Sequence, residues 1–210
     1  SASDLRVLGP HLDLADRLGV FTSQLCKGAP KRIAVSLNGD IPESASGPLG
    51  TAAVAGALRR AFDLPVNTVN ARLLAEERGI EMVVSRSERE LHGYAATIKV
   101  TLEDENSRSS VVGTLVSGKE GRVVAVNGIP LEAIPTGHML LIENEDQPGM
   151  IGHIGTELGN AGINISRMQL GLNSKTGKAL SIVSIDQPAP EALVASLEGR
   201  SILKVTPLSM

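Results

Sequence analysis

The stretch from His138 to Ile165, HMLLIENEDQPGMIGHIGTELGNAGINI, contains the pattern that decides the fold of the C-terminal part of the chain. It opens with an apolar run, Met139 to Ile142, which is typical of a buried strand. A polar turn with Pro148 and Gly149 follows, and apolar residues then recur at helical spacing before Gly162. The stretch therefore predicts a strand, a turn, a helix and the start of a second strand.

The pattern beyond Ile165 completes this unit. Apolar stretches flank the turn Asn173 to Gly177, and Pro188 and Pro190 precede a last helical segment. The resulting order, βαββαβ, is the ferredoxin-like arrangement. The strands are predicted at 138–143, 163–171, 179–185 and 202–208, and the helices at 149–161 and 190–197.

Two details of this unit predict contacts beyond it. Apolar residues fall on both faces of the predicted sheet, as in Met139 to Ile142 and Leu180 to Ile185, although two helices cover only one face. The second face is therefore expected to meet a partner, which predicts an oligomer. In addition, Gly152, Gly155 and Gly159 follow one side of the helix, where each costs about 1 kcal/mol relative to alanine. Close packing of another backbone is expected to compensate for them.

The turn between the first strand and the helix has the chemistry of an amino-acid site. A helix N-terminus favours a carboxylate. The carboxylate of Asp146 and the amide oxygens of Asn144 and Asn164 can accept hydrogen bonds from an ammonium group. This part of the sequence therefore predicts binding of a small zwitterion.

The N-terminal part shows helices first and strands later, which predicts an α+β domain. Asn127-Gly128 is a strong signal for a two-residue hairpin turn, and Ile41 to Leu49 has the composition of a loop. Thr51 and Asn70 are predicted to cap the helices that follow them. The helices are predicted at 11–27, 51–62 and 71–78, and the strands at 31–37, 80–85, 96–102, 110–115 and 122–126.

Ile134-Pro-Thr-Gly137 interrupts all periodicity, and the boundary between two domains is predicted there. The expected organisation is a linking helix in residues 1–29, a mixed α/β domain in residues 30–135 and the ferredoxin-like domain in residues 136–210. The chain begins with Ser1 and enters a helical pattern directly. It is therefore expected to be the C-terminal fragment of a longer protein.

Composition excludes several classes of function. A net charge of −3, with two Phe, one Tyr and no Trp, argues against nucleic-acid binding. Apolar runs too short for a membrane span argue against a membrane protein. The single cysteine, Cys26, excludes an intrachain disulfide, and the four histidines show no metal-ligand spacing, so no metal is expected. A cytoplasmic location fits best.

The motifs of both parts resemble the C-terminal region of the D-3-phosphoglycerate dehydrogenase family. The ferredoxin-like part resembles the ACT domain of that family, and the preceding part resembles its intervening, allosteric substrate-binding domain. The resemblance covers essentially the whole chain. It rests on 137–144, 146–149, 151–159 and 162–165 in the second part, and on Leu12 to Gly19, Val69 to Ile80, Val112 to Leu115, Arg122 to Val124 and Asn127-Gly128 in the first.

The resemblance implies an NAD-dependent enzyme that oxidises 3-phosphoglycerate to 3-phosphohydroxypyruvate, the first committed step towards L-serine. The catalytic domains, which would bind NAD, are not found in this sequence. Gly149, Gly152 and Gly155 are three residues apart on a predicted helix, which is the wrong spacing for a dinucleotide-binding fingerprint. The chain is therefore expected to be a regulatory region without a cofactor of its own, inactive when isolated.

Carried over residue by residue, the resemblance places Asn144, Asp146 and Asn164 against L-serine at the interface between two ACT domains, in a dimer or a tetramer. The backbone around Gly149, Met150 and Ile151 would hold the carboxylate of the effector. One departure concerns Gln147, which stands where the family usually has an arginine.

Some members of the family bind an anion in the intervening domain. Lys99, Arg108 and Arg122 are the candidate ligands here, although solvated strand residues are the favoured interpretation. Ile129 and Ile134 are apolar where further cations would be expected.

Two alternatives remain open at this point. The chain would fit a free-standing amino-acid sensor, which would begin near Ser1. It would also fit the β subunit of an iron–sulfur L-serine dehydratase, which combines similar domains. The second alternative is disfavoured because one cysteine cannot hold an iron–sulfur cluster.

Overall fold

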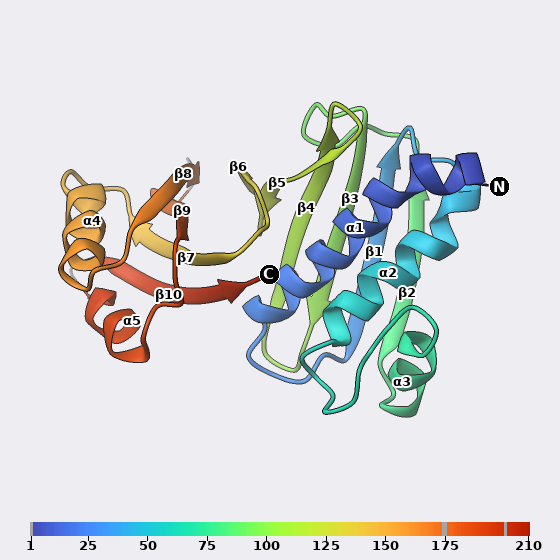
Figure 1. Cartoon of the computed structure of the whole chain (residues 1–210), viewed down its shortest axis with the longest axis horizontal. Helices are drawn as coiled ribbons and strands as arrows, with labels where there is room; N and C mark the ends of the chain where they lie inside the picture. Colours follow the sequence, from blue (N-terminus) through green and yellow to red (C-terminus); the bar gives the residue numbers. More distant parts are fainter. Residues whose placement is uncertain (1, 174–175, 200) are drawn as a thin grey trace. The chain divides into compact units, whose positions relative to one another are not determined.

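The computed structural model describes residues 2–173, 176–199 and 201–210, and the chain divides into two compact units, Ser1–Gly128 and Ile129–Met210 (Figure 1). The first contains α1 (Ala2–Leu25), β1 (Arg32–Gly39), the short 3₁₀ helix η1 (Glu43–Ala45), α2 (Ser46–Leu58), α3 (Ala71–Glu77), β2 (Glu81–Ser87), β3 (Ala96–Glu103), β4 (Arg108–Val116) and β5 (Glu120–Val126). The second contains β6 (Ile129–Ala133), β7 (His138–Glu145), α4 (Met150–Asn160), β8 (Ile165–Asn173), β9 (Lys178–Ile185), α5 (Glu191–Leu197) and β10 (Ile202–Ser209).

A mixed sheet in which the strands of the first unit run in the order β2-β1-β3-β4-β5 forms the frame of that unit. Strand β1 pairs in parallel with β2 and antiparallel with β3, and β4 and β5 continue the antiparallel pairing. Helices α1 and α2 cover one face of this sheet (Figure 1). Alternate residues of β1, namely Ile33, Val35 and Leu37, are fully buried. The α+β class predicted from the order of helices and strands is confirmed.

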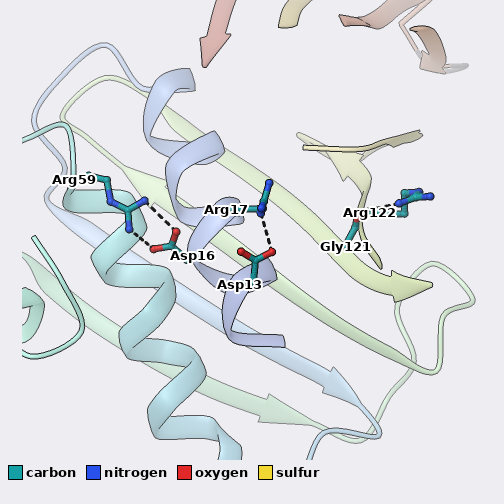
Figure 2. Close-up of polar contacts among 6 residues, drawn as sticks. All are labelled: Asp13, Asp16, Arg17, Arg59, Gly121 and Arg122. Atoms are coloured by element: carbon teal, nitrogen blue, oxygen red, sulfur yellow. Dashed lines mark hydrogen bonds and ion pairs between the residues drawn. The ribbon is translucent and has the colours of Figure 1, made fainter. Parts of the chain in front are cut away.

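Two glycines allow α1 and α2 to touch backbone to backbone. A Cβ atom at Gly19 would collide with the carbonyl oxygen of Ala53, and a Cβ atom at Gly56 with that of Asp16. Arg59 also links the helices, because its two terminal nitrogens donate hydrogen bonds to both carboxylate oxygens of Asp16, at 3.0 and 2.6 Å (Figure 2). A side chain at either glycine would push these helices apart.

The second unit has a four-stranded antiparallel sheet with the order β10-β7-β9-β8. Strand β7 pairs with β9 from His138 opposite Ile185 to Glu145 opposite Lys178. The predicted βαββαβ order is confirmed, and the strand order is that of a ferredoxin-like domain. The core between the sheet and the two helices includes Leu140, Ile142, Ile154, Leu158, Val183 and Leu197.

The second face of this sheet is already covered within the chain. Met139, Leu141 and Ile182 belong to this face and are at most 7% exposed. Strand β6 packs against β8 here, since a Cβ atom at Gly171 would collide with the carbonyl oxygen of Pro130. The premise that another copy must cover this face is therefore wrong.

The packing around the glycines of α4 also differs from the prediction. No other part of the described chain lies within 4 Å of where a Cβ atom would stand at Gly152, Gly155 or Gly159. The prediction that another backbone packs closely against this side of the helix is therefore wrong for the single chain. Close backbone contacts occur instead between α1 and α2, and between β6 and β8.

Helix α2 begins at Ser46, inside the segment predicted to be a loop. Pro48 lies in the first turn, where the missing N–H of proline is tolerated. Thr51, predicted to cap the helix, lies within it and donates a hydrogen bond to the carbonyl of Gly47 at 3.0 Å. Asn70 precedes α3 as predicted, but its side chain makes no capping hydrogen bond within the described chain.

The segments around the predicted domain boundary agree with the prediction only in part. Asn127 and Gly128 both have positive φ, 48° and 80°, as a two-residue hairpin turn requires. The strand that follows, β6, was not predicted, and the compact units divide after Gly128 rather than at residue 135. Helix α1 packs against α2, β3 and β4, so the predicted linking helix forms part of the first unit.

Candidate functional site

A hollow of about 210 Å³ lies between the first turn of α4 and the end of the sheet below it. The chain leaves β7, makes a turn through Pro148, and enters α4 at Gly149, whose φ of 91° suits glycine. The three backbone positions predicted to hold a carboxylate, Gly149, Met150 and Ile151, all line this hollow. The other lining residues are Asn144, Asp146, Gln147, Pro148, Gly152, Ile154, Leu170 and Ser181.

Asn144 forms part of the floor of the hollow and is only 3% exposed. Its Nδ2 donates a hydrogen bond to the carbonyl oxygen of Glu145 at 2.7 Å, which fixes the orientation of the amide. Its Oδ1 is buried and has no hydrogen-bond partner among the described residues. Because an unpaired buried acceptor costs about 1–3 kcal/mol, this oxygen is well suited to accept a hydrogen bond from a ligand.

The first turn of α4 adds backbone donors to the lining of the hollow. No side-chain hydrogen bond caps this helix within the described chain. The N–H of Met150 is 3.5 Å from the carbonyl of Gln147, a weak contact, and the regular helical ladder starts with the N–H of His153 on Gly149 at 2.9 Å. The early N–H groups and the positive end of the helix dipole therefore favour an anionic group here.

Asp146 stands at the exposed rim of the hollow. Its backbone N–H donates to the carbonyl of Gly177 at 3.1 Å, which holds the turn against the β8–β9 loop. Gln147, in the position where an arginine was expected, bridges Glu145 and Ser201 with its amide, at 3.1 and 3.2 Å. A carboxylate at the rim and a carbonyl-type oxygen on the floor make one side of the hollow attractive to a cation.

Ser181 is a lining residue that the sequence reasoning missed. It is fully buried in β9, opposite Ile142 on β7 and Leu170 on β8, and its Oγ has no partner among the described residues. The available signal was a hydroxyl within the apolar run Ala179 to Val183. Alternation places this position on the face that carries Ile142 and Asn144, the face covered by α4.

Asn164 lies at the other end of the sheet. It follows the C-terminus of α4 and precedes β8, whose Ile165 pairs with Ile185, whereas Asn144 pairs with Ala179. Six residues of β9 separate the two positions, roughly 20 Å at the usual rise per residue. Asn164 therefore does not join Asn144 and Asp146 around one helix N-terminus within a single chain.

The three cations proposed for an anion site do not gather either. Lys99 lies opposite Val112 on β4, but Arg108 lies opposite Glu103, four residues along β3 and about 13 Å away. Arg108 is paired with Glu103 at 3.2 Å. Arg122 bonds the carboxylate of Glu120 at 2.7 Å and the carbonyl of Gly121 at 3.3 Å; Figure 2 shows this last contact. The interpretation as solvated strand residues fits Arg108, which is exposed, but not Arg122, whose side chain is only 20% exposed.

A second hollow, of about 350 Å³, lies among α2, α3 and β2 in the first unit. The cation in its lining, Arg72, is exposed and lies 3.3 Å from the carboxylate of Glu76. Within the described residues, no three His, Cys, Asp or Glu side chains gather as metal ligands would, and no helix is long and apolar enough to span a membrane. The hollow at α4 is the stronger candidate for a ligand site, because two fully or nearly fully buried side chains in its lining, Asn144 and Ser181, have oxygens without a partner among the described residues. The second hollow has one such oxygen among the described residues, on the half-buried Ser46.

Comparison with known proteins gives consistent results for both units. Residues 7–127 match the model of the D-3-phosphoglycerate dehydrogenase intervening domain, and residues 138–200 match that of the ACT domain. The D-3-phosphoglycerate dehydrogenase of Synechocystis sp. is 36% identical over 191 residues, which cover 90% of this chain and 34% of that protein.

Two further relatives have the same name. The D-3-phosphoglycerate dehydrogenase of Bacillus subtilis is 32% identical over 188 residues, covering 90% of this chain and 36% of the relative. The D-3-phosphoglycerate dehydrogenase of Methanocaldococcus jannaschii is 30% identical over 191 residues, covering 91% of this chain and 36% of the relative. The chain thus spans about a third of the length of the curated relatives it matches.

Proposed function

Since the chain belongs to the D-3-phosphoglycerate dehydrogenase family, of which it carries the intervening and ACT domains, we propose that it is the amino-acid-sensing regulatory region of such an enzyme and that L-serine is its effector. The complete enzyme would oxidise 3-phosphoglycerate with NAD, and NAD would bind in catalytic domains outside this chain. The isolated chain is expected to reduce no NAD.

The observation that carries this proposal is the buried, unpartnered Oδ1 of Asn144 beside the uncapped N-terminus of α4. In an amino acid, an ammonium group and a carboxylate are attached to one carbon. The lining of the hollow offers both kinds of partner, acceptors from Asn144 and Asp146 and backbone donors from the first turn of α4. Its volume, about 210 Å³, is below the range of about 300–1,000 Å³ typical of drug-sized ligands, which favours a small amino acid.

Asn164 would join this site through a second copy of the chain. It is exposed, and it lies about 20 Å from Asn144 in the same chain. We propose that ACT domains of two chains associate so that the Asn164 side chain of each completes the hollow of the other. A single chain would then bind serine weakly, and binding would depend on protein concentration.

Binding at such a shared site would regulate the enzyme by shifting an equilibrium between two arrangements of its subunits. An effector shifts that equilibrium only by the difference in its affinity for the two arrangements. Coupling of this kind is typically 1–3 kcal/mol, or about 5–150-fold in affinity. Serine bound between two ACT domains would favour the arrangement in which both halves of the site are assembled.

Calorimetric titration of the chain with L-serine, with D-serine and glycine as controls, tests the proposal. We expect saturable binding of L-serine that Asp146→Ala weakens by about tenfold or more, because it removes a charged acceptor. The matched control is Glu145→Ala, since this exposed neighbouring carboxylate does not line the hollow. Absence of saturable binding at millimolar L-serine, or equal loss in both variants, would contradict the proposal.

A further inference from the structure

The hollow is also lined by Ser181, whose hydroxyl group has no role in the proposed function. The ammonium group and the carboxylate of a bound amino acid would interact with Asn144, Asp146 and the first turn of α4 instead. Ser181 lies opposite Ile142 on β7, and Asn144 lies two residues further along β7 on the same face. Diagonal neighbours of this kind are about 7–8 Å apart. An amino acid whose ammonium group is bound by Asn144 could therefore reach Ser181 with its own side chain, provided that this side chain is short.

Ser181 and Asn144 share an unusual feature. Both are at least nine-tenths buried, both line the hollow, and each has a side-chain oxygen without a hydrogen-bond partner among the described residues. Buried polar side chains are nearly always paired, so two unpaired oxygens in one small hollow indicate that something outside the chain pairs them. This observation is independent of the helix N-terminus above them.

The two oxygens differ in the hydrogen bonds that they can form. The Oδ1 of Asn144 only accepts hydrogen bonds, which suits an ammonium group, whereas the hydroxyl of Ser181 both donates and accepts, which suits another hydroxyl. The neighbouring walls are apolar, formed by Ile154 and Leu170. A ligand with a methyl side chain would fill this corner but would leave the Ser181 hydroxyl unpaired.

We propose that Ser181 hydrogen-bonds the side-chain hydroxyl of the effector and thereby makes the site selective for a small hydroxyl-bearing amino acid over alanine and glycine. This inference rests on the proposed function, because it assumes that an amino acid binds at α4. A single hydrogen bond between neutral groups accounts for a preference of about tenfold.

Titration of wild type and Ser181→Ala with L-serine and L-alanine measures this selectivity. We expect wild type to bind L-serine about tenfold more tightly than L-alanine. In Ser181→Ala the affinity for L-serine should fall about tenfold, while the affinity for L-alanine stays the same or rises. The matched control is Ser184→Ala, because Ser184 is on the same strand but on the opposite face, opposite Met139. It should leave both affinities unchanged.

Three outcomes would overturn the inference, and they differ in what they say about the proposed function. Unchanged affinities for both L-serine and L-alanine in Ser181→Ala, with binding still lost in Asp146→Ala, would remove Ser181 from recognition and leave the effector site intact. Equal loss for both ligands would make Ser181 a positioning residue rather than a selective one. No binding of either amino acid to wild type would refute the proposed function and this inference together.

Discussion

Helix α4 has an asparagine and an aspartate near each of its ends: Asn144 and Asp146 at its N-terminus, Asn164 and Asp186 at its C-terminus. At the C-terminal end these groups pair with each other. The N–H of Asn164 donates to Oδ1 of Asp186 at 3.0 Å, and the N–H of Asp186 donates to the carbonyl of Asn164 at 3.2 Å. At the N-terminal end, Oδ1 of Asn144 is buried without a partner among the described residues.

The difference shows that residue type does not decide whether the polar groups of a turn are already hydrogen-bonded within the chain. Asn and Asp are common in turns because their side chains bond nearby backbone groups, as Asp186 does. At Asn144, by contrast, the amide oxygen has no partner among the described residues and adjoins a hollow, and the proposed ligand site rests on these two features. We call the C-terminal end of α4, with Asn164 and Asp186, the paired end, and its N-terminal end, with Asn144 and Asp146, the unpaired end.

The largest expected effect is on stability at the paired end. Ile163 follows α4, is 4% exposed and packs in the core of the second unit. Ile163→Ala should lower the free energy of unfolding of that unit by about 2–4 kcal/mol, because it removes buried methyl groups and leaves a cavity. Ile151→Ala at the unpaired end, where the side chain is 58% exposed, should change it by at most about 0.5 kcal/mol.

Urea unfolding followed by circular dichroism would measure both variants. A similar loss in the two would mean that Ile151 supports the fold as Ile163 does, and the contrast between the two ends would fail. Wild-type-like stability of Ile151→Ala together with weakened serine binding would sharpen it.

A smaller effect is expected from the two aspartates. Asp186→Ala removes the acceptor for the Asn164 N–H and should destabilise the second unit by about 1 kcal/mol, since the group is exposed and water replaces part of the bond. Asp146→Ala should leave the stability without ligand within about 0.5 kcal/mol of wild type. Thermal unfolding compares them, and addition of L-serine should stabilise wild type but not Asp146→Ala.

The sequence predicted the frame of the second unit well because its signals are strong and local. Apolar alternation, with Pro148 and Gly149 between the first strand and the helix, marks the strands and helices that the structure contains. The hairpin at Asn127-Gly128 was predicted for the same reason. Helix α2 was predicted to start late, because a proline and two glycines near its start resemble a loop, although Pro48 is tolerated in a first turn.

The site was predicted only in part, because pairing is a property of three dimensions. Asn144, Asp146 and the backbone from Gly149 to Ile151 do line one hollow. The sequence could not show that Asn164 lies at the opposite end of the sheet, since both asparagines flank the same helix. Nor could it single out Ser181, whose significance depends on the absence of a partner in the described structure.

Asp104 in the β3–β4 turn provides a third case, in which a carboxylate is fully paired. Its oxygens accept hydrogen bonds from the Ser107 hydroxyl at 2.7 Å and from the backbone N–H groups of Asn106, Gly28 and Ser107. The Ser107 hydroxyl and then these N–H groups lower the pKa of Asp104 from 3.8 to about 2. Because the folded pKa is depressed, the stabilisation is present above pH 3.8 and is lost as the pH falls towards 2.

We therefore expect Asp104→Asn to flatten the fall in unfolding free energy of the first unit between pH 4 and about pH 2. The effect should be modest because Asp104 is only half-buried and solvent screens its carboxylate. Denaturant unfolding at a series of pH values measures it, with Asp63→Asn as a control on an exposed carboxylate of that unit. Identical pH slopes in wild type and Asp104→Asn would show that the bonds of this turn contribute nothing to folding.

The smallest effect, and the most direct test of the unpaired end, concerns Ser181 without ligand. Because its hydroxyl has no partner among the described residues, Ser181→Ala removes a buried polar group without breaking a hydrogen bond. The free energy of unfolding should stay within about 0.5 kcal/mol of wild type or rise. Thr22 is the matched comparison, since it is equally buried but donates to the carbonyl of Leu18 at 2.7 Å. Thr22→Val should lower stability by about 1 kcal/mol. A loss of that size in Ser181→Ala would mean that its hydroxyl is satisfied without an effector, and the two ends of α4 would no longer differ in kind.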